Sequence, residues 1–233
     1  MKRNRFMGAG LLLALAWTAH GAASGGNPPA YSTAQTAELQ RLENDPRIKR
    51  ATAAWRQAST EATRQHLRAV AAQGDARDLL AASMLWSGLG IWDGTTAPTP
   101  AAPAQETRTW FDAARRARPR EVLVAWMEAS DCAGLSDSCN PGEALQFLLQ
   151  AEPDNAATQL LALAAADKRG DRKEAEVHWQ AAASATRYDP HMLEIGQLLH
   201  AAMRDVPQPP LGPHVAETMG VRYGLGRPVT ARE

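Results

Sequence analysis

The chain has 233 residues, and its 25 lysine and arginine residues balance its 25 aspartate and glutamate residues. This balance supplies no net field that would attract nucleic acid or an anionic membrane surface, so neither is expected as a partner. Alanine is abundant, whereas Val, Ile, Phe and Tyr are scarce. Such a composition favours helix over sheet and predicts an all-α protein.

The N-terminal residues have the pattern of a signal peptide. Basic side chains at residues 2–5 precede an apolar run at residues 7–19, and small residues follow that run. A membrane-spanning helix needs roughly 20 apolar residues, which favours cleavage over the alternative of a retained membrane anchor. We therefore assign residues 1–23 to a signal peptide and residues 24–31 to a linker, and expect a periplasmic or secreted chain.

Two helical segments are expected at the start of a helical repeat domain, which we place at residues 32–205. The first covers residues 34–43 and ends before Pro46, because proline disfavours helical geometry in the residue before it. The second covers residues 47–72. It is either one long helix or two helices separated near Ser59.

A pair of helices is expected after Gly74. Asp75 is placed to cap a helix that ends near Gly88 and carries leucines at helical spacing. A segment rich in Thr, Ala and Pro then leads to a second helix at residues 106–118. Arginines gather near the carboxyl end of this second helix, where the helix dipole favours cations.

Three prolines, Pro119, Pro153 and Pro190, are spaced by 34 and 37 residues. Each is expected to open a helix, and each follows a helix that carries an aromatic residue and alanines. In the best-defined pair of helices, Gly170 is expected in the left-handed conformation at the turn and Asp171 is expected to cap the second helix. A period in this range indicates stacked helical hairpins.

Residues 119–190 resemble the tetratricopeptide repeat family, through the Gly170-Asp171 turn and through Ala175, Trp179 and Ala182 in the helix that follows. Residues 74–119 resemble a Sel1-like unit, with Gly-Asp at the start, then LWSGLGI and WFDAARRA. The whole chain is similar to exported repeat proteins of Gram-negative bacteria. The resemblance implies an α-solenoid of antiparallel helical hairpins with a concave face that binds a peptide or protein.

Aligning the helices that follow the three prolines gives the side chains expected on the concave face. Trp126 is the central candidate because tryptophan is a frequent anchor of protein interfaces, and core packing is the competing interpretation of this residue. The expected partner-binding residues are Leu123, Trp126, Ser130, Leu160, Asp167, Glu194 and Gln197.

Cys132 and Cys139 lie close together in a loop, and in an oxidising compartment such a pair is expected to form a structural disulfide. The alternatives are a redox pair and a metal site that includes Asp131 and Asp137. A redox pair usually has the shorter C-x-x-C spacing, and a zinc site needs further ligands. A disulfide is therefore the prediction.

No motif for a serine nucleophile, a zinc protease, a phosphate-binding loop or a dinucleotide site is found in the sequence. His191 and His200 fall on opposite sides of one helix, so we expect no metal and no cofactor. The expected function is a non-catalytic protein-interaction module, with an enzyme or enzyme accessory of cell-envelope metabolism as the alternative. Residues 206–233 are a proline-rich tail, with at most one short helix that either caps the last repeat or stays unstructured.

Overall fold

The computed structural model describes residues 37, 40–42, 44–89, 104–130, 132 and 134–216. The predicted signal peptide, the predicted linker and the last part of the tail lie outside these residues, as does Asp131 of the alternative metal site. Throughout the described ranges the ordered elements are helices, and no strand is present. The all-α expectation is therefore confirmed.

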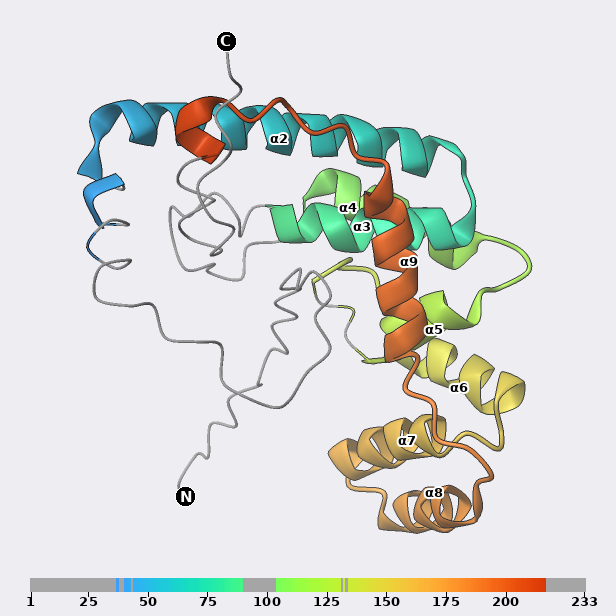
Figure 1. The fold of residues 1–233 in the computed structure, drawn as a ribbon. Coiled ribbons are helices and arrows are strands. Elements are labelled where there is room, and N and C mark those ends of the chain that lie inside the picture. Colours follow the sequence, from blue (N-terminus) through green and yellow to red (C-terminus); the bar gives the residue numbers. More distant parts are fainter. Residues whose placement is uncertain are drawn as a thin grey trace.

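Helix α2, Pro46–Ala72, is a single helix of 27 residues. Asp45 accepts a hydrogen bond from the Arg47 backbone amide and caps its N-terminus. At 1.5 Å per residue the helix is about 40 Å long. This decides the open question of one helix or two in favour of one, and Figure 1 shows α2 lying across one side of the molecule.

Helices α3, Ala76–Leu89, and α4, Gln105–Arg116, form the first hairpin. Helix α3 is the centre of the fold, since it packs against α2, α4, α5 and α9. Its residues Leu79 to Ser83 are consecutive and all buried. The rings of Trp86 and Trp110 join α3 to α4 edge to face, with their centroids 5.2 Å apart.

Helices α5, Val122–Ser130, and α6, Pro141–Ala151, form the second hairpin. The loop between them is closed by the predicted disulfide between Cys132 and Cys139, whose Cα atoms are 6.2 Å apart. Asn140 caps α6 by accepting a hydrogen bond from the Glu143 amide. The cysteine pairing expected from the sequence is confirmed.

Helices α7, Ala156–Arg169, and α8, Arg172–Ser184, form the third hairpin. Gly170 has φ 77° and ends α7 in the left-handed conformation, and Asp171 caps α8, as predicted. Pro153 does not start α7 as expected. Asn155 is the N-cap, because its side chain accepts the Ala157 amide, so that Pro153 lies in the corner before the helix.

Helix α8 rests on α7 through a narrow stripe of small and half-buried side chains that includes Ala175, His178 and Ala182. The spacing of Ala175, Trp179 and Ala182 predicts one packed side for all three, and for Trp179 this is wrong, since its side chain is 54% exposed. In an alanine-rich helix, small residues occur on more than one side. The side that packs on α7 is the one with His178, whose Nδ1 lies 2.9 Å from Gln159 Oε1.

Helix α9, Met192–Arg204, packs against α3 and α2. Figure 1 shows it running from the α7–α8 hairpin back towards α2. The chain then continues along α2, and residues 213–216 form one short helical turn there. We call residues 206–216 the C-terminal strap.

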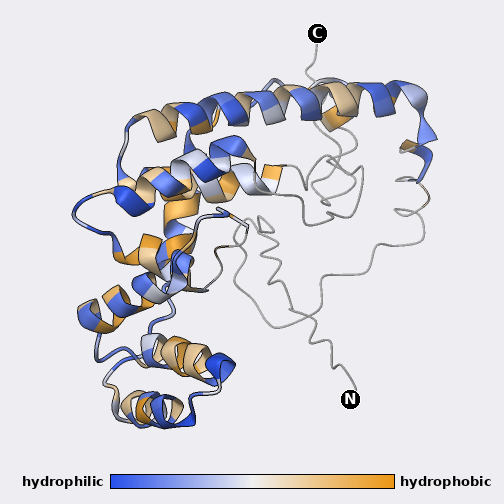
Figure 2. Ribbon diagram, turned by 180° about the vertical axis from the view of Figure 1, so that it is seen from behind, coloured by the Kyte–Doolittle hydropathy of each residue, from blue (hydrophilic) through white to orange (hydrophobic). Residues whose placement is uncertain are grey.

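The hydrophobic core draws on α3, α4, α5, α6, α7 and α9, and on the end of α2. Its largest fully buried side chains include Phe111, Leu80, Leu123 and Leu148. Figure 2 shows the contrast between this apolar centre and α2, much of which is hydrophilic. Among the described residues, no helix is long and apolar enough to span a bilayer.

Candidate functional site

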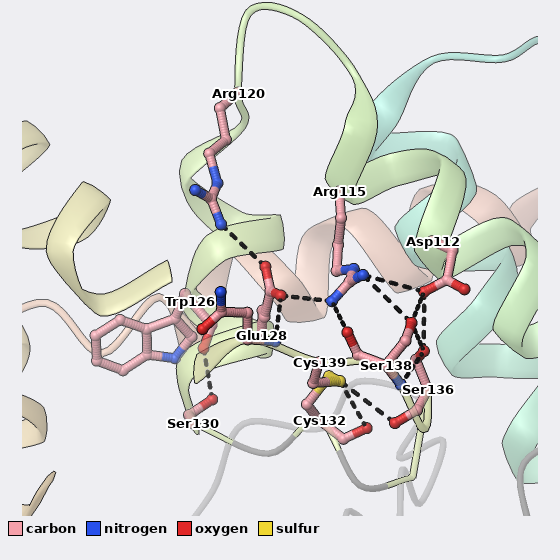
Figure 3. Close-up of a disulfide and its surroundings, with 11 residues drawn as sticks. Asp112, Arg115, Arg120, Trp126, Glu128, Ser130, Cys132, Ser136, Ser138 and Cys139 are labelled. Atoms are coloured by element: carbon pink, nitrogen blue, oxygen red, sulfur yellow. Dashed lines mark hydrogen bonds and ion pairs between the residues drawn. A yellow bond between two sulfur atoms is a disulfide. The ribbon is translucent and has the colours of Figure 1, made fainter. Parts of the chain in front are cut away.

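Of the three predicted partner-binding residues of α5, Leu123 and Trp126 belong to the interior, whereas Ser130 is exposed. Leu123 is 1% exposed and Trp126 is 8% exposed, and both are part of the hydrophobic core. Ser130 donates a hydrogen bond to the Trp126 carbonyl oxygen at 2.7 Å (Figure 3). For Trp126 the structure therefore agrees with the core-packing interpretation, because α5 is apolar on several sides and is enclosed by its neighbours.

The other four predicted residues are accessible but lie on two separate helices. Leu160, 37% exposed, and Asp167, also exposed, are on α7. On α9, Gln197 is exposed and Glu194 accepts a hydrogen bond from Arg77 of α3. With Leu123 and Trp126 buried, the seven side chains do not make up one exposed surface.

A buried polar cluster joins the corner before α7 to the segment before α9. We call it the corner cluster, and its members are Glu152, Asn155, Arg187, Asp189 and His191. Glu152, Asn155 and His191 are each less than a tenth exposed. Buried polar groups are costly unless they are hydrogen-bonded, so the bonding of this cluster decides whether it stabilises the fold.

Glu152 uses both of its carboxylate oxygens. Oε1 accepts a hydrogen bond from Arg187 at 2.8 Å, and Oε2 lies 2.9 Å from His191 Nε2. Asn155 and Thr158 also donate to Oε2. Burial raises the pKa of Glu152, but the hydrogen bonds from His191, Arg187 and Asn155 lower it by more, so its pKa lies below the ordinary value. The carboxylate is therefore held in its charged form.

His191 is 4% exposed and has φ 57°, which is unusual for a residue other than glycine. Its Nε2 must donate to Glu152, since a carboxylate only accepts. Its Nδ1 is buried without a hydrogen-bond partner and lies 3.7 Å from Glu194 Oε2. The ring meets Trp126 edge to face at 5.1 Å, which brings α5 to the start of α9.

Sequence reasoning missed this cluster. Glu152 and Arg187 stand in short corners between helices, where charged residues are normally solvated, and nothing in the local pattern marks them as buried. His191 and Glu194 do share a helical face by spacing. The partner that matters most for His191, however, is 39 residues away in the chain.

A second buried carboxylate, Glu128 of α5, lies between two arginines (Figure 3). It is 3% exposed, and it accepts hydrogen bonds from Arg115 at 2.6 Å and from Arg120 at 3.0 Å. The Asn140 amide donates to it at 2.9 Å. Arg115 also donates to the Ser138 carbonyl oxygen within the disulfide loop at 2.9 Å. The cluster thus ties α4, α5 and the loop together.

These two networks stabilise the fold. The oxygens of both carboxylates accept hydrogen bonds from donors of the chain itself. A cavity of about 200 Å³ lies elsewhere, where α2, α3 and α9 meet. Its lining residues are His66, Val70, Gln73, Asp78, Leu198, Ala201, Ala202 and Asp205. Within the described ranges, no group of His, Cys, Asp and Glu side chains is arranged to hold a metal ion.

Large apolar side chains are exposed on and around the α7–α8 hairpin. Helix α8 contains no buried residue, and it displays Val177 at 59% and Trp179 at 54% exposure. Tyr188, in the segment before α9, is 65% exposed, and Leu193, in the first turn of α9, is 77% exposed. Exposed apolar side chains are typical of surfaces that contact another protein when they gather in one patch.

Comparisons of this chain with protein-family models, with curated proteins and with solved structures find no match.

Proposed function

We propose that the mature chain is an exported, non-catalytic module that binds a protein or peptide partner, and that the α7–α8 hairpin is its main contact surface. The observation that carries the proposal is the exposure of Val177 and Trp179 on a helix with no buried residue. Tryptophan is enriched among the residues that contribute most to binding energy. Leu160 and Asp167 of the neighbouring α7 are exposed as well.

The arrangement of the hairpins supports the same proposal. Helices α3–α4, α5–α6 and α7–α8 follow one another as antiparallel pairs, as in a degenerate tetratricopeptide or Sel1-like solenoid. In a continuing solenoid the next helix would cover α8, whereas α9 packs against α3 instead. The last hairpin is therefore left with an uncovered side, which is the place where a partner would add its own apolar surface.

Export is part of the proposal. The disulfide between Cys132 and Cys139 supports it, since such bonds form and persist in oxidising compartments. An N-terminal segment with the pattern of a signal peptide supports it as well.

The test is capture of partners from an envelope extract on the immobilised mature chain. The double variant Val177→Ala/Trp179→Ala should lower the retained amount of the specific partner about tenfold or more, because truncating an interface tryptophan commonly costs about 2 kcal/mol. Gln180→Ala, on the same helix and also exposed, is the matched control. Equal retention by the wild type and the double variant would rule out α8 as the contact surface.

A further inference from the structure

The C-terminal strap lies along the first half of α2 (Figure 1). Of the first 13 residues of this helix, Ile48 is the one whose side chain is fully buried, whereas Leu67, Val70 and Ala71 in the second half reach the core. The strap runs along the helix in the direction opposite to it (Figure 1). The contact between them is therefore a separate recognition surface, outside the main hydrophobic core.

Four polar side chains form a stripe on this side of α2: Thr52, Trp55, Ser59 and His66. At 100° per residue they fall within about 60° of one another around the helix. Three of them reach the chain that follows α9 or its last turn. Trp55 Nε1 donates to Pro209 O at 3.1 Å, Ser59 Oγ donates to Gln208 Oε1 at 3.0 Å, and His66 Nε2 lies 2.9 Å from Ala202 O. We call these four residues the donor stripe.

The donor stripe suits a proline-rich ligand because of the groups that it presents. An indole N–H only donates, and a ring nitrogen facing a carbonyl oxygen must also donate. Proline residues lack the backbone N–H, so a proline-rich segment offers carbonyl acceptors and few donors. Thr52 Oγ1, on the same stripe, is buried and makes no hydrogen bond within the described residues. One donor thus remains for a ligand that fits better than the strap.

Two residues of the strap that are three positions apart face α2. Val206 is 8% exposed and Pro209 is half-buried, whereas residues 207, 208 and 210–214 are exposed. A polyproline II helix has three residues per turn and no internal hydrogen bonds, so one residue in three faces the surface on which it lies. This is the manner in which proline-rich segments dock against aromatic side chains in peptide-recognition domains.

We propose that Thr52, Trp55 and Ser59 of the donor stripe form a binding site for a proline-rich, extended segment of a partner protein, and that the strap occupies this site within the free chain. A tethered segment has an effective concentration of about millimolar, so a few contacts keep the strap in place. A partner segment binds when it replaces the strap. The site shares no residue with the α7–α8 hairpin, so this proposal is tested independently of the proposed function.

The experiment uses the full mature chain and a fluorescently labelled peptide of residues 206–213. Fluorescence anisotropy measures its dissociation constant for the wild type and for a variant with a loosened strap, Val206→Ser/Pro209→Gly/Pro210→Gly. The loosened variant should bind the peptide at least tenfold more tightly than the wild type, because the competing segment is weakened. Adding Trp55→Phe to the loosened variant should weaken binding about fivefold, because one hydrogen bond is lost while the ring stays.

Two controls separate recognition of the prolines from non-specific binding of the peptide. A peptide with alanine at each proline should not bind the loosened variant, and Val177→Ala/Trp179→Ala should leave peptide binding unchanged. Equal affinity of the loosened variant for the proline and alanine peptides would overturn the proposal. An unchanged NMR signal of the Trp55 indole N–H in the loosened variant would also overturn the proposal. It would mean that Trp55 does not hold the strap. A concentration-dependent dimer that does not bind the peptide would also overturn it, in favour of strap exchange between two copies.

Discussion

Asn155 and Asp189 are 34 positions apart in the chain and exchange two hydrogen bonds. Asn155 Nδ2 donates to the Asp189 carbonyl oxygen at 2.9 Å, and the Asp189 amide donates to Asn155 Oδ1 at 2.9 Å. Oδ1 also accepts the Ala157 amide as the N-cap of α7, and Nδ2 also donates to Glu152. One buried side chain thus fixes both the start of α7 and the path of the chain into α9.

Replacing Asn155 should therefore cost more than the loss of a helix cap. Asn155→Ala is expected to lower the free energy of unfolding by about 2–4 kcal/mol, because the Asp189 amide and the Glu152 carboxylate both lose a partner. The control is Asp171→Ala, which removes the exposed cap of α8 and should cost about 1 kcal/mol. Urea unfolding measures both values, and equal costs for the two variants would contradict this role of Asn155.

Glu152 makes the stability of the fold depend on acid. Its pKa in the folded chain is lower than the ordinary value, so its contribution is complete above the ordinary pKa of about 4.3 and is lost as the pH falls through the folded value. Glu152→Gln should lower the free energy of unfolding by about 2–3 kcal/mol at pH 7. The difference from the wild type should shrink as the pH falls below about 4.3. A difference that is constant over this range would count against the charged Glu152.

Glu128 and Glu143 both bind Arg120, but Glu128 is buried and Glu143 is exposed. Arg120 reaches both carboxylates at 3.0 Å, yet the side chain of Glu128 is 3% exposed and that of Glu143 is 61% exposed. Removing a partner from a buried ion pair leaves uncompensated charge, so Glu128→Gln should cost about 3–5 kcal/mol. Glu143→Gln should change stability by less than about 0.5 kcal/mol. Thermal or urea unfolding distinguishes the two, and similar costs would refute the buried network.

Two glycines should respond to alanine in opposite directions. Gly196 lies inside α9, and a Cβ added there meets no atom within 4 Å. Gly196→Ala should stabilise the chain by about 0.5–1 kcal/mol, since alanine has the higher helix propensity. Gly170→Ala should destabilise it by about 1 kcal/mol, because residue 170 has φ 77°. A shift in the same direction for both variants in calorimetry would contradict the conformations assigned to these residues.

The helices could be predicted from sequence because their signals are local. Proline corners, the Asp171 cap and the left-handed Gly170 each act within a few residues of their own position, and the structure has the cap and the glycine where they were expected. The cysteine pair was equally accessible, since the two residues are seven positions apart.

The buried networks and the path of the chain after α9 could not be predicted in this way. Glu152 pairs with His191 across 39 positions, and Trp55 pairs with Pro209 across 154. Such contacts depend on how whole helices pack. Several of the residues involved lie in corners between helices or in the proline-rich tail, where the sequence pattern predicts contact with solvent. The exposure of Trp179 was missed for a related reason. Helix α8 has alanines on several sides, and only its contact with α7 decides which side is covered.

The proposed role of the α7–α8 hairpin is tested most directly by photo-crosslinking in cells that export the chain. A photoreactive side chain is introduced at position 179, and in a second strain at position 116, which is exposed on α4. We expect a discrete adduct with one partner from position 179 and no such adduct from position 116. Adducts from position 116 alone, or the absence of any adduct from position 179, would contradict the proposed role of the hairpin.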